Sequence, residues 1–144
     1  MTAQDFPLAS RWTQSERGPM PSSVLARITP MTPFGAVRLN MRAMTFFQKS
    51  RTLSPEVFST IIANPVEIPA EKTREWLLKQ HPGDCPVFVS WRAELALETS
   101  WHIITDYWDA FCYPSSDDLA VWPENEQWVL AYYHNETFEF GRKR

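Results

Sequence analysis

The sequence predicts an α+β fold, with helices in the first half followed by a strand, a helix and a C-terminal antiparallel β-meander. Three observations support this prediction. Apolar residues recur at helical spacing up to His81, the pattern changes to short apolar runs after Gly83, and three such runs follow one another closely near the C-terminus. The length of 144 residues fits a single domain that spans 1–144.

The N-terminal half is predicted to hold four segments. Residues 1–33 carry five prolines and should be largely irregular, with one short helix after Pro21. Residues 34–50 carry an apolar stripe at helical spacing. Residues 54–64 begin with Ser-Pro-Glu, which is typical of a helix start. A further helix is expected at 70–81, where His-Pro-Gly ends it. The members of the stripe in 34–50 are Val37, Met41, Met44 and Phe47.

The C-terminal half alternates between strand and helix signals. Residues 86–91 are apolar and β-branched, which predicts a buried strand. Glu98-Thr99-Ser100 should cap a helix whose inner face carries aromatic residues. Short polar turns then separate three further strands, and such short connections favour antiparallel pairing. The inner face of the helix is Trp101, Ile104, Trp108 and Phe111, and the strands are 119–122, 127–133 and 137–140.

Charge is distributed unevenly along the chain. The net charge is −3, yet residues 93–141 hold ten Asp or Glu and no Lys or Arg. An acidic surface repels phosphate backbones and anionic lipids and attracts basic proteins, so neither nucleic acid nor a membrane is expected as a partner. The alternative is that these carboxylates only keep the protein soluble. With no signal peptide or apolar span, we expect a cytoplasmic protein whose Cys85 and Cys112 are reduced.

No established catalytic or cofactor-binding motif is present. The phosphate-binding patterns G-x-x-x-x-G-K-[ST] and G-x-G-x-x-G and the nucleophile pattern G-x-S-x-G are all missing, so no cofactor is expected. Cys112 could pair with His102 or His134 as a thiol nucleophile. It follows an apolar helix, however, where the helix dipole disfavours a thiolate. We therefore predict that Cys112 is a buried structural residue.

One group of residues resembles a metal site. His134 and Glu136 should lie on the same face of a strand, and Asp118 could approach from a neighbouring strand. Metal ions usually need three or more converging ligands, and no P-C-x-x-C accompanies the H-x-E pattern as it does in zinc deaminases. A small metal-dependent hydrolase that uses Asp117, Asp118, His134 and Glu136 remains the alternative hypothesis.

The C-terminal strings E-T-S-W-H-I-I-T-D-Y-W-D-A-F-C-Y-P-S-S-D-D and W-V-L-A-Y-Y-H-N-E-T-F-E-F-G-R-K resemble a family of small bacterial proteins of unknown function. That family shows a T-x-W…W-x-x-F helix, an acidic turn and a last strand that ends in Gly and basic residues. A weaker similarity covers Trp12 and 25–31. Similar C-terminal strings are also like those of immunity proteins, which neutralise bacterial toxins. The resemblance covers about half of the chain and implies a bacterial origin, protein binding and no catalytic residues.

The leading hypothesis is a non-enzymatic, immunity-type inhibitor that binds a cognate, basic bacterial toxin through an acidic and aromatic surface. Carboxylates would steer the association and form salt bridges, and aromatic side chains would anchor the complex. The predicted partner-binding residues are Asp117, Asp118, Trp122, Glu124, Glu126, Trp128, Tyr133 and Glu136.

Overall fold

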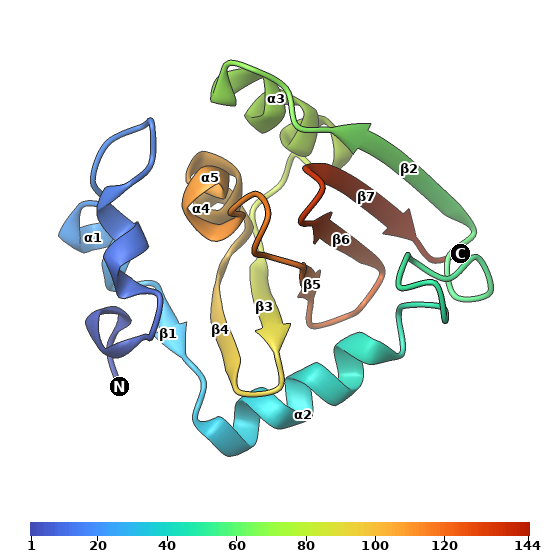
Figure 1. Cartoon of the computed structure of the whole chain (residues 1–144), viewed down its shortest axis with the longest axis horizontal. Helices are drawn as coiled ribbons and strands as arrows, with labels where there is room; N and C mark the ends of the chain where they lie inside the picture. The colour runs from blue at the N-terminus through green and yellow to red at the C-terminus, as the bar shows by residue number, and fades with distance from the viewer.

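A computed structural model describes all residues, 1–144, and contains one seven-stranded antiparallel sheet with helices on both faces (Figure 1). The strand order is β1-β4-β3-β5-β6-β7-β2. The strands are β1 (Thr29–Pro30), β2 (Thr60–Pro65), β3 (Pro86–Arg92), β4 (Leu95–Ser100), β5 (Leu119–Pro123), β6 (Trp128–Tyr133) and β7 (Thr137–Arg142). The helices are α1 (Ser22–Leu25), α2 (Pro33–Met44), α3 (Ala70–Gln80), α4 (Trp101–Asp106) and α5 (Trp108–Phe111), with 3₁₀ turns at Ala3–Asp5 and Ala9–Thr13.

The sheet separates two hydrophobic cores. The larger core lies between one face of the sheet and the layer formed by α3, α4, α5 and the N-terminal turns, and it includes Trp12, Leu77 and Trp101. The smaller core lies on the opposite face, beneath α2 and the loop 45–59, and includes Phe46 and Trp122. Strand alternation creates this division, because successive side chains point to opposite faces.

The predicted α+β class is confirmed, and so is the C-terminal meander. Strands β5, β6 and β7 pair antiparallel in sequence order, with Leu119 opposite Tyr132 and Tyr133 opposite Thr137. The expected helix near 70–81 is α3, in which Leu77 is fully buried. The four predicted inward residues of 101–111 are also buried, although Tyr107 divides that segment into α4 and α5.

The helix predicted at 54–64 is wrong. Residues 55–57 form a turn, and β2 begins at Thr60 and pairs along its length with β7. The β-branched run Thr60-Ile61-Ile62 explains the outcome, because such residues pack well on a pleated sheet and lose side-chain freedom in a helix. The sequence prediction also missed β4, which pairs with β3 through a tight connection.

Helix α2 begins at Pro33, where the Thr32 side chain accepts a hydrogen bond from the Gly35 backbone N–H and caps the helix. Its inner face is made of small residues, Ala36 and Ala43, which are buried against β3 and β4. Small side chains allow the helix to lie close to the sheet. Leu39 also packs against the smaller core, whereas Phe34, Val37, Met41 and Met44 lie on the other face of α2.

Candidate binding site

Half of the ten acids in segment 93–141 are exposed, and the others are buried or half-buried and have partners within the protein. Asp117 is only 6% exposed and accepts two hydrogen bonds from Arg11, at 2.6 and 3.2 Å. The Arg11 guanidinium also lies over the Tyr113 ring, 3.8 Å from its centroid, and the Tyr113 backbone N–H donates to Asp117 at 2.9 Å. Asp117 therefore holds the N-terminal segment to the sheet and is not available to a partner.

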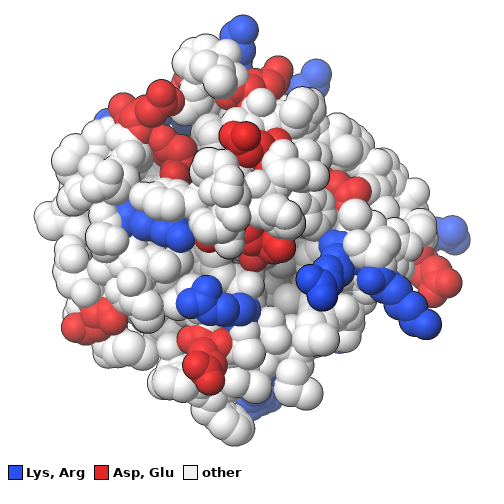
Figure 2. Space-filling model, in the orientation of Figure 1, with Lys and Arg blue, Asp and Glu red and all other residues white.

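Other carboxylates of the segment are paired in the same way. Glu126 receives hydrogen bonds from Arg42 of α2 and also faces Lys143, and both cations lower the pKa of Glu126 below its ordinary value. Asp106 accepts a hydrogen bond from Arg74 of α3 at 2.8 Å. Basic residues of the first half thus neutralise acids of the second half. On the face drawn in Figure 2, acidic and basic side chains are interspersed.

Two of the predicted aromatic anchors are buried in the core, where they are not accessible to a partner. Trp122 is 1% exposed and packs against Phe46 and Phe88, while Trp128 is 6% exposed and packs against Trp101. Both tryptophans are core residues on opposite faces of the sheet. The third predicted anchor, Tyr133, is half-buried, and its hydroxyl donates to Glu139.

The remaining predicted acids do not converge. Asp118 and Glu136 lie at one end of β6, and Glu124 follows β5 at the opposite end. The six residues of β6 separate these ends by roughly 20 Å. These three acids are exposed, but a single side chain of a partner could not contact all of them.

The metal-like set is only partly assembled. Asp118 does approach His134, since its Oδ1 lies 2.9 Å from Nδ1 and accepts a hydrogen bond from the His134 backbone N–H. Asp117 points away from this pair toward Arg11. No group of three or more His, Cys, Asp and Glu side chains in the protein is placed to hold a metal ion. Of the four residues in the hydrolase hypothesis, only Asp118 and His134 are therefore in contact.

Neither cysteine has the surroundings of a nucleophile. Cys112 is 3% exposed, and burial raises the pKa of its thiol. Cys85 lies 4.0 Å from His81 Nε2, a contact that the sequence prediction missed. Burial raises the pKa of the Cys85 thiol and lowers that of His81, so both groups remain neutral at pH 7. Such a pair does not supply the thiolate that catalysis needs.

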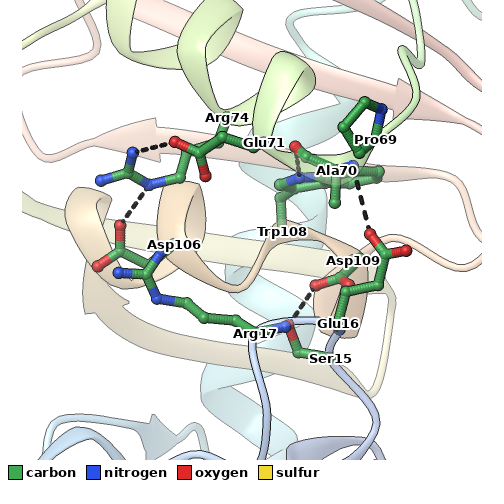
Figure 3. Close-up of a pocket in the computed structure, with 10 residues that line it drawn as sticks. All are labelled: Ser15, Glu16, Arg17, Pro69, Ala70, Glu71, Arg74, Asp106, Trp108 and Asp109. Carbon is green, nitrogen blue, oxygen red and sulfur yellow. Dashed lines mark hydrogen bonds and ion pairs between the residues drawn. The ribbon is translucent and has the colours of Figure 1, made fainter.

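A hollow of about 340 Å³ lies where the loop 13–18 meets α3 and α5 (Figure 3). Most of the charged groups around it have partners within the protein, although Arg17 takes part in no ion pair. Asp109 accepts hydrogen bonds from the Ser15 hydroxyl and the Glu16 backbone N–H, and Arg74 bridges Glu71 and Asp106. These contacts attach the N-terminal loop to the helices, which is a structural role.

The outer face of α2 carries an unpartnered apolar surface. Phe34, Met41 and Met44 are 75%, 65% and 66% exposed, and Val37 between them is 37% exposed. These four residues, here called the α2 stripe, follow one another at spacings of three or four and so lie along one side of the helix. The spacing predicted from the sequence is correct for three of them, but the stripe faces outward.

A hollow of about 640 Å³, here called the α2 hollow, lies beside the C-terminal part of the stripe. It is bounded by α2, the loop 47–51, the β3–β4 turn and the start of β5. Met44 belongs to both the stripe and the lining. The lining residues are Asn40, Ala43, Met44, Phe47, Gln48, Lys49, Arg51, Ser90, Trp91, Arg92, Ala93, Asp118, Leu119 and Ala120.

The surroundings of the α2 hollow are basic. Lys49, Arg51 and Arg92 are exposed and take part in none of the ion pairs of the protein. Between Arg17 and Pro55 the sequence contains no Asp or Glu. This acid-free stretch is the signal in the sequence that could have located the site.

No helix in the protein combines the length and the apolar character needed to cross a membrane. No family model, no curated protein and no solved structure matches the chain. The α2 stripe and the α2 hollow are therefore interpreted from their own geometry.

Proposed function

We propose that this protein is a non-enzymatic binding protein that docks a partner protein on the α2 stripe. The observation that supports this proposal most directly is the exposure of three large apolar side chains, Phe34, Met41 and Met44, in one row of a single helix. Contiguous apolar patches of this kind mark interaction sites on soluble domains. Methionine side chains are flexible and polarizable, which suits them to packing against another protein.

A partner protein fits this surface better than a bilayer or a nucleic acid. The stripe lies next to a concave hollow, which can receive a protruding side chain, whereas a bilayer offers a flat surface. Only three unpaired cations surround the hollow, and Asp118 belongs to its lining. A phosphate backbone is bound by a longer track of basic groups. A polypeptide with apolar and acidic side chains matches both the stripe and the charge beside it.

The resemblance of the C-terminal strings to immunity proteins implies one form of this activity, the neutralisation of a cognate bacterial toxin. In that form the α2 stripe would cover part of the toxin. Lys49, Arg51 and Arg92 beside the stripe take part in no ion pair, so we propose that the contact surface of the partner is apolar and acidic.

The test compares affinity capture by the wild-type protein with capture by M41Q/M44Q, using lysate of the source bacterium and a fixed bait concentration. The matched control is I68Q, because Ile68 is 85% exposed and lies outside the stripe. We expect wild type and I68Q to retain the same protein in stoichiometric amount and M41Q/M44Q to lose it. If that protein is toxic when expressed alone, wild type should protect cells and M41Q/M44Q should not.

Retention by M41Q/M44Q at the wild-type level would refute docking on the stripe. A triple variant, D118N/E124Q/E136Q, tests the surface predicted from the sequence. If only this variant loses the partner, the binding site consists of the exposed acids of the second half and not of the stripe. Circular dichroism of each variant verifies that its fold is intact, which is expected because every substituted side chain is exposed.

A further inference from the structure

The floor of the α2 hollow is made of small residues. Ser90 of β3 pairs with Ala120 of β5 on one side and Ala96 of β4 on the other. Ala43 of α2 and Ala93 of the β3–β4 turn also line the hollow, and Met44 and Phe47 form taller walls. The hollow therefore exists because helix and sheet meet here through short side chains.

Ser90 brings an unused hydrogen-bonding group to this floor. It is 3% exposed, and its Oγ makes no hydrogen bond in the protein. Alternation along β3 places Ser90 on the same face as Phe88, which packs in the core beneath α2. A buried hydroxyl without a partner forfeits the hydrogen bonds it made in water, as the hydroxyls of Thr99 and Ser100 on β4 also do. The presence of a serine at this position is explained if its hydroxyl interacts with a bound ligand.

Arg51, at the edge of the hollow, is one of four non-glycine residues with positive φ in the protein. Its φ is 70°, the left-handed region, which costs a residue with a Cβ about 1 kcal/mol or more. The turn that contains it is closed by the Arg51 backbone N–H, which donates to the Gln48 carbonyl at 2.8 Å. Glycine or asparagine would fit this position at lower cost. An arginine in a strained turn is consistent with a role for its side chain outside folding.

We infer that the α2 hollow is a carboxylate pocket, which receives an Asp or Glu side chain of the partner that docks on the α2 stripe. The inference rests on the proposed function and adds the chemical identity of the group that the partner presents. Lys49, Arg51 and Arg92 surround the carboxylate, and the unpartnered Ser90 hydroxyl lies beneath it at the floor. The apolar residues that flank the acid in the partner contact Met44 and Phe47.

A carboxylate fits this pocket better than a phosphate group. Half of the fourteen lining residues are hydrophobic, so the pocket favours a ligand with a small charged head and an apolar body. Asp118 also belongs to the lining, although its Oδ1 is engaged by His134. Its negative charge penalises a dianion more than a monoanion.

The test uses the peptide Ac-Leu-Glu-Leu-amide, its uncharged counterpart Ac-Leu-Gln-Leu-amide and inorganic phosphate as probes. Protein labelled at the methionine methyl groups is titrated with each and followed by NMR, because Met44 lines the pocket whereas Met20 is buried elsewhere. We expect the Glu peptide to shift the Met44 methyl signal with an affinity about tenfold higher than the Gln peptide, a difference typical of one charge-assisted contact. Equal affinity for the two peptides would refute a carboxylate pocket. A stronger response to phosphate than to the Glu peptide would assign the site to phosphate ligands.

Two variants separate the role of the pocket from folding. R51G removes the guanidinium and relieves the strained backbone, and S90A removes the unpartnered hydroxyl. We expect both proteins to be at least as stable as wild type and to bind the Glu peptide about fivefold to tenfold more weakly. R38Q is the matched control, since Arg38 is exposed on α2 outside the pocket and should leave binding unchanged.

These outcomes are distinguishable from failure of the proposed function. Wild-type affinity of R51G and S90A for the Glu peptide would overturn the pocket, even if M41Q/M44Q loses its partner. Conversely, selective binding of the Glu peptide together with full partner capture by M41Q/M44Q would preserve the pocket and overturn docking on the stripe.

Discussion

Adjacent residues of this chain have opposite surroundings, and Asp117 and Asp118 show how this arises. Asp117 is buried and bound by Arg11, whereas the side chain of Asp118 is 56% exposed and bound by His134. Both precede β5, where alternation sends neighbouring side chains to different faces. The acidic pair is visible in the sequence, but the burial of its first member depends on Arg11, which lies 106 residues earlier.

At the residue scale, D117N should lower the free energy of unfolding by about 3 kcal/mol or more, because it leaves the Arg11 charge buried without a counter-charge. Urea unfolding followed by tryptophan fluorescence measures this change. D118N is the control and should cost less than about 0.5 kcal/mol, since its side chain is exposed. A double variant, R11M/D117L, should be more stable than D117N. Equal stability of D117N and D118N would contradict the role of the buried pair.

Gly141 provides a second test at the scale of single residues. A Cβ built at this position of β7 would lie 2.8 Å from Phe58 Cγ and 3.1 Å from Leu53 Cδ1, and both of those side chains are buried. G141A should therefore destabilise the protein by about 1–3 kcal/mol through overpacking. G83A is the comparison, because a Cβ there meets nothing within 4 Å. Thermal unfolding should show a large shift for the first variant and almost none for the second.

At the scale of elements, the strands of the meander and helix α3 could be predicted because their local signals agree with the tertiary structure. The segment 54–64 could not, because its Ser-Pro-Glu start is typical of a helix while its Thr60-Ile61-Ile62 run is suited to a strand. Pairing with β7 decided the outcome, and that strand lies more than seventy residues further along. The sequence also does not predict which face of α2 is buried. In the structure, the face that carries Ala36 and Ala43 packs against the sheet.

The contact between α2 and the β5–β6 turn should make stability depend on pH. Hydrogen bonding from Arg42 lowers the pKa of Glu126 in the folded protein, so the pair contributes stability above the unfolded value near 4.5 and loses it as the pH falls through the folded value. At pH 7, E126Q should be less stable than wild type by about 0.2–1 kcal/mol, as expected for a partly exposed ion pair. Urea titrations at decreasing pH should show this difference disappear below pH 4.5. A difference that persists unchanged at low pH would contradict the ion pair.

At the scale of the whole molecule, the uneven charge of the sequence is explained by pairing between its halves. Arg11, Arg42 and Arg74 come from the first half and neutralise Asp117, Glu126 and Asp106 of the second. The pairing removes Asp117, Glu126 and Asp106 from the predicted acidic surface, because charge along a sequence does not reveal which charges meet. Asp118, Glu124 and Glu136 are exposed and remain predicted partner-binding residues, whereas the α2 hollow depends on four segments that meet only in the folded protein.

The same pairing makes the proline-rich N-terminal segment part of the fold. Trp12 is 1% exposed and packs on Phe111, and Phe6 is 5% exposed and packs on Trp91. A protein that lacks residues 1–18 should lose its cooperative unfolding transition, because it forfeits these contacts and leaves Asp117 buried without Arg11. Near-ultraviolet circular dichroism measures the loss. W12A alone should cost about 3–5 kcal/mol. A shortened protein with the wild-type transition would show that the segment is dispensable.

The strand order has a consequence for how the chain is made. The two edges of the sheet, β1 and β2, belong to the first half of the chain, while the strands that they border, β4 and β7, are synthesised later. A ribosome releases the N-terminal half first, and β2 has no strand to pair with until β7 has emerged. Folding is therefore expected to follow translation. A nascent chain arrested before β7 should remain sensitive to proteases and should bind chaperones, regardless of the duration of the arrest.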